Sequence, residues 1–183
     1  MFLASTNTQS EDLVSCKVFL NDPRRFQEMN GAYAEFVPTD DPPARATVRA
    51  NLVNVLFSTE IQCVAVDSGT RSVVNAQARG RSPFSPGIDV GDRVYVAGAT
   101  GRGATAAEET SSALERIRAT LSAASLDFDD LEEVWVYLAD VRDWESVHEV
   151  LVEEFGADYP APTVVGNRLV GRSTVEIQVT ARR

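Results

Sequence analysis

The feature that most constrains the fold of this chain is a pattern that occurs twice. Each copy begins with an Asp-Leu step into an apolar, strand-like segment, and continues through a helical segment and a proline-rich turn to a closing Glu-Ile-Gln strand. The opening segments are residues 12–20 and 130–138, and the closing tripeptides are residues 60–62 and 176–178. The repetition predicts two units that share one local topology.

The two copies differ at a position that matters chemically. When Thr47 is aligned with Thr163, Arg45 of the first copy falls opposite Ala161 of the second. A guanidinium is a planar fork that binds carboxylates through paired hydrogen bonds. The difference therefore suggests that only the first copy can hold an anionic substrate.

Composition excludes several classes of function. The formal net charge of −10 argues against nucleic acids and anionic membranes as partners, because both are bound through clustered lysine and arginine. The apolar runs are too short to span a bilayer, and the N-terminus has no basic segment followed by an apolar one. We therefore expect a cytoplasmic protein of one or two domains, with Cys16 and Cys63 as buried thiols rather than a disulfide.

The spacing of apolar residues predicts a β-α-β-β unit followed by a β-β-β-α-β-α-β-β unit. Asp22, Thr105 and Asp140 are expected to cap the three helices, and Thr105 forms a capping box with Glu108. A turn at residues 67–70 separates the units, which we place at residues 1–68 and 71–183. The expected strands are residues 13–20, 46–53, 57–66, 72–75, 88–90, 93–97, 131–138, 163–169 and 173–181.

Two helices on one face of a mixed sheet make an α+β sandwich of two layers. Several strands are nevertheless apolar on both faces, most clearly at residues 134–137. Such strands indicate a sheet that also packs against other sheets, and hence an oligomer or a pseudo-oligomer.

An ordered set of motifs runs through both units. In the second unit the motifs are residues 82–86 (Ser-Pro-Phe-Ser-Pro), 90–98, 130–138 and 176–178; in the first they are residues 19–22, 29–36, 43–48 (Pro-Ala-Arg-Ala-Thr-Val) and 60–62. With these motifs the second unit resembles a complete domain of the RidA family, also called YjgF. The first unit resembles the last part of another such domain, so we expect a tandem arrangement. Whether the chain starts too late at Met1 or consists of one and a half domains stays open.

The resemblance implies a chorismate-mutase-like fold and a trimer around a central barrel of sheets, with active sites in the clefts between neighbours. The implied activity is hydrolysis of enamines and imines, such as 2-aminoacrylate, to a keto acid and ammonia, with no metal or organic cofactor. Arg45 matches the arginine that binds the substrate carboxylate. Glu60 matches the glutamate that orients or activates water, and these two are the expected catalytic residues.

The chain also departs from the family pattern. Phe84 stands where members often carry tyrosine, Ala97 replaces a serine before Gly98, and Thr47 occupies the position of a reactive cysteine in some members. We therefore expect no thiol chemistry at Thr47. Phe84, Ala97 and Gly98 of a neighbouring unit are expected to form the wall against which Arg45 holds the substrate.

Other polar residues have plainer interpretations. His148 is expected to be a solvated helix residue, and one histidine with two separated cysteines cannot supply a zinc site. Arg168 and Arg172 are expected in a solvated turn. Glu176 is interpreted as a strand residue, because its own copy lacks the arginine.

Three hypotheses remain open from the sequence. The first is an imine or enamine deaminase with one working site per chain, acting on a small carboxylate metabolite. The second is a binding module that holds a small anionic metabolite without turnover, and the third is a structural subunit. In each case we expect a homo-oligomer, either a trimer or a pseudo-trimeric arrangement of tandem units, rather than a monomer.

Overall fold

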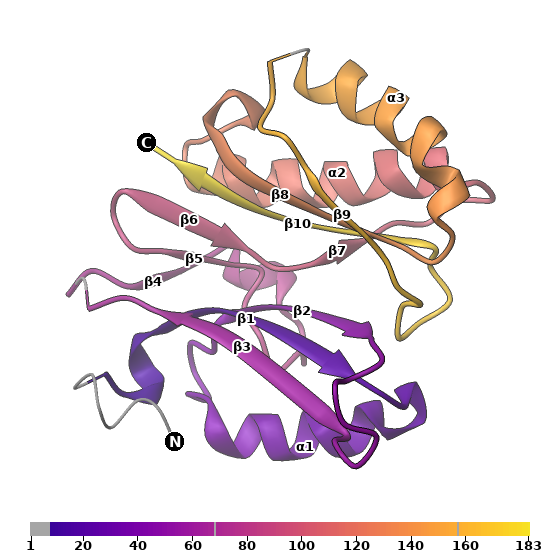
Figure 1. Cartoon of the computed structure of the whole chain (residues 1–183). Coiled ribbons are helices and arrows are strands. Elements are labelled where there is room, and N and C mark those ends of the chain that lie inside the picture. Colours follow the sequence, from indigo (N-terminus) through magenta and orange to yellow (C-terminus); the bar gives the residue numbers. More distant parts are fainter. Residues whose placement is uncertain (1–7, 68, 157) are drawn as a thin grey trace.

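The chain is arranged in four layers, with two β-sheets packed face to face and helices on both outer sides (Figure 1). The structure is a computed structural model that describes residues 8–67, 69–156 and 158–183. The predicted boundary turn includes residue 68, which lies outside the described residues.

The smaller sheet has three strands in the order β2-β1-β3. Strand β1 (Leu13–Leu20) pairs in parallel with β2 (Ala44–Arg49) and antiparallel with β3 (Thr59–Ala65). Helix α1 (Phe26–Phe36) connects β1 to β2 and covers the outer face of this sheet (Figure 1). Strands β2 and β3 are therefore its two edges.

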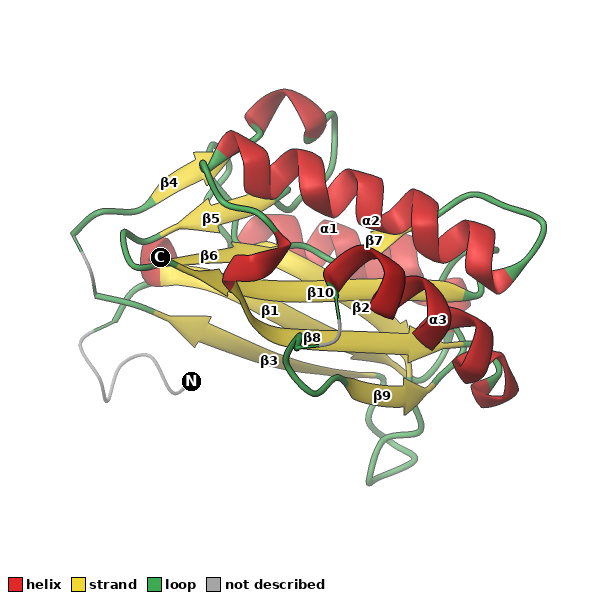
Figure 2. Cartoon of the chain, turned by 90° about the horizontal axis from the view of Figure 1, so that it is seen from above, coloured by secondary structure: helices red, strands yellow, loops and turns green. Residues whose placement is uncertain are grey.

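The larger sheet has seven strands in the order β4-β5-β6-β10-β8-β9, and β7 pairs with β10 beside this path. Helices α2 and α3 lie across its outer face (Figure 2). The strands of this sheet and the two helices that cover it are β4 (Ser72–Val74), β5 (Gly87–Asp89), β6 (Arg93–Val96), β7 (Ala99–Thr100), α2 (Ala106–Ala123), β8 (Leu131–Leu138), α3 (Trp144–Phe155), β9 (Thr163–Gly166) and β10 (Val175–Arg182).

The predicted repetition of topology is visible in the strand pairing. Strand β8 pairs in parallel with β9 and antiparallel with β10, just as β1 pairs with β2 and β3. Helices α1 and α3 each follow a short 3-10 helix, and these start in the same way. The carboxylates of Asp22 and Asp140 accept hydrogen bonds from the backbone N–H groups of Arg24 and Arg142. The capping box of Thr105 is also present.

Most expected strands are found, with shifts at their ends. The expected strand at residues 46–53 ends at Arg49, and residues 50–58 form a loop instead. Strand β7 was not expected, because two residues carry no readable period. The described strands β1 and β8 have the predicted bounds.

The strands that are apolar on both faces are explained by the contact between the two sheets. Val134 and Val136 pack with α2 and α3, whereas Trp135 and Tyr137 pack with Val48 of the smaller sheet. A second cluster between the sheets contains Val14, Ala44, Ile88, Val90 and Ala97. The α+β fold is thus confirmed, and its sheet-on-sheet packing occurs within a single chain.

A disulfide joins Cys16 of β1 to Cys63 of β3. The two cysteines are register partners on antiparallel strands, with their Cα atoms 4.1 Å apart. The expectation of two buried thiols is therefore wrong. The expectation follows from the reducing conditions of the cytoplasm, whereas the register between β1 and β3 decides whether the two sulfur atoms meet.

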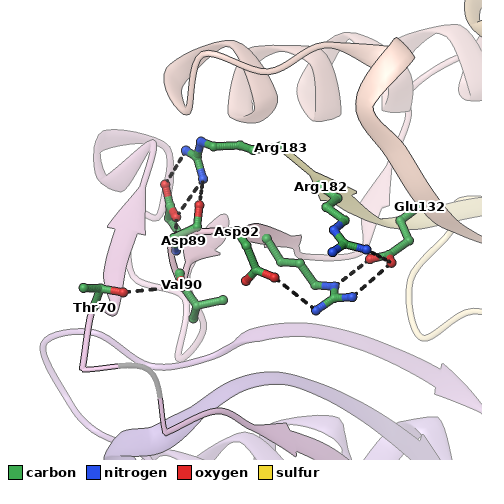
Figure 3. A network of polar contacts seen from close by, with 9 residues as sticks. Thr70, Asp89, Val90, Asp92, Glu132, Arg182 and Arg183 are labelled. Atoms are coloured by element: carbon green, nitrogen blue, oxygen red, sulfur yellow. Dashed lines mark hydrogen bonds and ion pairs between the residues drawn. The ribbon is translucent and has the colours of Figure 1, made fainter.

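Ion pairs hold the C-terminal end of β10 to its neighbours (Figure 3). Arg183 contacts the carboxylate of Asp89, at the end of β5, at 2.7 Å. Arg93 of β6 contacts Glu132 of β8 at 2.6 Å, and Arg182 lies 3.8 Å from the same carboxylate. Partly exposed pairs contribute little stability individually, but this network helps to fix the register of β10.

None of the helices in the described part of the chain combines the length and apolar character that crossing a membrane requires.

Candidate functional site

A pocket of about 330 Å³ lies where the outer edge of β2 meets the larger sheet. The N–H of Gly98 donates to the carbonyl oxygen of Arg45 at 3.0 Å, and the N–H of Ser85 donates to that of Pro43 at 3.2 Å. These bonds fix β2 against the second repeat. The pocket is lined by Phe26, Arg45, Thr47, Phe84, Gly98, Thr100, Arg116, Leu169, Val170, Gly171, Ser173 and Glu176.

Arg45 is the buried cation of this pocket, with an exposed fraction of only 2%. Its Nη2 donates to Asn30 Oδ1 at 2.7 Å, whereas its Nε and Nη1 have no hydrogen-bond partner. The rings of Tyr33 and Phe84 flank the guanidinium, with centroids 4.7 and 4.9 Å from Cζ. Burial lowers the pKa of Arg45, yet a guanidinium stays charged in proteins. A buried charge with free donors is the arrangement expected of an anion-binding site.

Glu176 of β10 supplies a carboxyl group to the same pocket. Its Oε1 lies 3.4 Å from the backbone nitrogen of Thr47, which is the donor. Burial raises the pKa of Glu176 to about 7, an effect that the Thr47 N–H, Arg45 and Arg116 partly offset. A carboxyl group of this pKa can both accept and donate a proton near neutral pH.

Gly98 makes room for this carboxylate. A Cβ atom at position 98 would lie 2.1 Å from Glu176 Oε1 and 2.9 Å from the Cβ of Ala46. A side chain there would therefore push Glu176 away from Thr47. This is the structural reason for a glycine at this point of the wall.

The structure brings together three of the five residues proposed from the sequence. Arg45, Phe84 and Gly98 all line the pocket. Ala97 does not: it is buried between the two sheets, although it lines a neighbouring pocket.

Glu60 is not brought to Arg45. It lies exposed on β3, at the opposite edge of the smaller sheet. Its register partner on β1 is Phe19, which packs toward the larger sheet, whereas the partner of Arg45 is Cys16, which packs with α1. The carboxylate beside Arg45 is that of Glu176, so the predicted pairing of Arg45 with Glu60 is corrected.

Sequence reasoning missed residues from both repeats. Asn30 and Tyr33 belong to the motif at residues 29–36, but the sequence assigned no function to them. Arg116 lies in none of the recognised motifs. The retention of Glu176 in the copy that lost its arginine was the available sign that the two copies share one site. The sequence interpretation instead took both catalytic residues, Arg45 and Glu60, from the first copy.

Of the residues given plain interpretations, Glu176 is corrected by its place in the pocket, whereas His148, Arg168 and Arg172 lie where they were expected. His148, Arg168 and Arg172 are exposed, and the ring of His148 lies 5.0 Å from that of Trp144. Among the residues that the structure describes, no three or more histidine, cysteine or acidic side chains gather as they would around a metal ion.

Comparison with known proteins places the chain in a family. The profile of the family described as endoribonuclease L-PSP matches residues 1–67 and 75–183. The chain belongs to the endoribonuclease L-PSP family. The resemblance to RidA and YjgF proteins is thereby confirmed at the level of the family.

Individual members of the endoribonuclease L-PSP family match about half of this chain or somewhat more. A RutC family protein of Saccharolobus solfataricus is 36% identical over 110 residues, which are 55% of this chain and 87% of that protein. The human 2-iminobutanoate/2-iminopropanoate deaminase is 30% identical over 100 residues, covering 50% and 73%. The crystal structure of Rv2704, a YjgF/YER057c/UK114 family member from Mycobacterium tuberculosis, is 28% identical with a TM-score of 0.56, covering 62% of this chain and 100% of Rv2704.

Proposed function

We propose that this chain is a RidA-like deaminase that hydrolyses small imines bearing a carboxylate to a keto acid and ammonia. The observation that carries the proposal is the buried guanidinium of Arg45, whose Nε and Nη1 are unpartnered in a pocket shared with Glu176. The human relative named as an imine deaminase supports the same reaction class.

In this proposal Arg45 binds the substrate carboxylate through Nε and Nη1. Asn30 holds Nη2 at 2.7 Å and so fixes the plane of the guanidinium. A charge-assisted hydrogen bond contributes roughly 1.5–3 kcal/mol, which is enough to orient a small acid. The rings of Tyr33 and Phe84 exclude water from around the pair.

The chemical step is the addition of water to the imine carbon. The ionised carboxylate of Glu176 takes one proton from water as the oxygen bonds to that carbon and the C=N π electrons move to nitrogen. Glu176 then gives this proton to the nitrogen, which forms a carbinolamine. Glu176 next takes the hydroxyl proton and passes it to the amino nitrogen as the C–N bond breaks, so that ammonia leaves and the C=O bond of the keto acid forms. Such proton relays contribute roughly a hundredfold or more to rate.

We also propose that the chain is a tandem arrangement of two RidA-like repeats, which the shared pocket supports. The first repeat supplies Arg45 and the second supplies Glu176, so the cleft between them is complete within one polypeptide. Ala161 takes the place of the arginine in the second repeat. We therefore propose one working site per chain.

Two other functions are weaker candidates. A binding module without turnover is favoured by the phenyl ring of Phe84, which puts no hydroxyl group in the pocket. The ribonuclease activity in the family's name is the weaker of the two, because a net charge of −10 opposes binding to RNA phosphates. Small carboxylates are the partners that this site fits.

The experiment is to measure ammonia release from 2-iminopropanoate generated in situ. The purified chain should accelerate release over the spontaneous rate, and Arg45→Ala should remove this acceleration and the thermal shift caused by 2-oxobutanoate. The double change of Arg168 and Arg172 to glutamine is the matched control and should retain activity. A thermal shift without faster ammonia release would instead support a binding module.

A further inference from the structure

A second guanidinium, that of Arg116, lines the same pocket. It reaches the pocket from α2, where its Nη1 donates to the carbonyl oxygen of Thr100 at 2.8 Å. No carboxylate of the described residues forms an ion pair with Arg116, although its charge is felt by Glu176. By contrast Arg118, on the same helix, is held by Glu154 at 2.5 Å and lies over the ring of Phe128.

Arg116 borders two neighbouring pockets. Phe84, Gly98 and Arg116 also line a neighbouring pocket of about 200 Å³. Space for a longer ligand thus lies next to the pocket of Arg45, and it is bordered by the guanidinium of Arg116, which is bonded to a backbone carbonyl group.

The charges in the pocket exceed what a monocarboxylate needs. Two guanidinium groups face one carboxyl group, that of Glu176. A substrate with a single carboxylate would engage Arg45 and leave the guanidinium of Arg116, which is an exposed residue, to Thr100 and solvent. A substrate with a second carboxylate would satisfy both cations, and each such contact is a charge-assisted hydrogen bond.

We propose that Arg116 binds the distal carboxylate of the substrate, so that the preferred substrates are imines of short 2-amino dicarboxylic acids. The inference rests on the proposed deaminase function and deepens it. Arg45 holds the carboxylate next to the imine carbon, and Arg116 selects for length and for the second charge.

Binding of keto acids tests this without requiring turnover. Titration calorimetry with 2-oxoglutarate and 2-oxobutanoate should show tighter binding of the dicarboxylate by the unmodified chain. Arg116→Gln should weaken 2-oxoglutarate binding roughly tenfold or more, a larger factor than for 2-oxobutanoate. Arg116→Lys keeps the charge and should restore part of the preference, and Arg118→Gln is the matched control on the same helix.

Each outcome decides something different. If Arg116→Gln weakens both keto acids by the same factor, or neither, the inference is overturned while the proposed deaminase site stands. If the unmodified chain binds neither keto acid, the proposed function fails together with the inference. If 2-oxobutanoate binds as tightly as 2-oxoglutarate, the preference for dicarboxylates is absent, so the inference is overturned and the proposed deaminase function stands.

Discussion

Glu176 lies in surroundings that favour the neutral form of its carboxyl group. Its exposed fraction is 6%, and burial raises its pKa to about 7. The same residue faces a guanidinium and a backbone N–H group, which favour the ionised form. The balance leaves both forms populated at neutral pH, as a group that accepts and returns a proton requires.

Replacement of this carboxyl group by an amide tests its role. Glu176→Gln should lower the rate of ammonia release roughly a hundredfold or more while keto-acid binding persists, because an amide cannot accept the proton. The rate of the unmodified chain should rise with pH through about 7. Glu60→Gln is the matched comparison on β3 and should be nearly silent; a large loss there and none at Glu176 would restore the pairing first read from the sequence.

The same pKa predicts how stability depends on pH. The carboxyl group of Glu176 binds protons more tightly in the folded chain than in the unfolded chain, so stability is lost as pH rises from about 4.5 to about 7. The loss is on the order of 3 kcal/mol for this shift. Urea unfolding should show that the free energy of unfolding of the unmodified chain falls relative to that of Glu176→Gln as the pH rises over this range. A difference independent of pH would contradict the assignment.

At the scale of elements, the starts of helices could be predicted from neighbouring residues better than the ends of strands. The caps at Asp22, Thr105 and Asp140 act through adjacent backbone groups and could be read from the sequence. Strand ends depend on which neighbour supplies hydrogen bonds, and β2 stops at Arg49, whose N–H already donates to Arg168 in the other repeat. Contacts of that kind leave no local pattern.

The candidate site shows the same division. Arg45, Phe84 and Gly98 lie in motifs that could be recognised, and their proximity follows from the packing of one repeat on the other. The partner of Arg45 could not be found by comparing copies, because Glu60 and Glu176 are equivalent in sequence. The order β2-β1-β3 puts Glu60 on the edge strand away from β2. The packing of the two sheets brings Glu176 of β10 to Thr47 of β2.

The disulfide between β1 and β3 gives a prediction about the edge strand. It connects residues 47 positions apart, and cross-links of this kind typically stabilise by about 2–4 kcal/mol. A thiol assay on the unreduced, denatured chain should detect no free thiol, and reduction should release both and lower the melting temperature. Detection of both thiols before reduction would contradict the disulfide and support the predicted cytoplasmic location.

At the scale of the whole molecule, one side carries an edge strand of each sheet. Strands β3 and β9 are the outer strands of their sheets and lie along the same side (Figure 2). Ile61, Val64 and Val164 on these strands are 47%, 43% and 37% exposed. Exposed apolar edge strands favour pairing with another chain. We propose that this side forms the interface of a homo-oligomer.

Light scattering at micromolar concentration measures this directly. The unmodified chain should have a mass of at least twice the 19.9 kDa of one copy. Ile61→Lys should shift the population toward a single copy, because a charge at the edge resists burial. Val152→Lys, at an exposed position on α3, should leave the mass unchanged. A stable monomer of the unmodified chain would remove this proposal.

The two walls of the pocket come from different parts of one polypeptide, and this affects how the protein can evolve. In a symmetric assembly every substitution is copied into each equivalent cleft, so a residue cannot change on one wall without changing at all of them. Here Arg45 and Ala161 occupy equivalent positions in one gene product. Selection can therefore adjust the two halves separately, and a laboratory library can vary the Arg45 wall while the Glu176 wall is held constant.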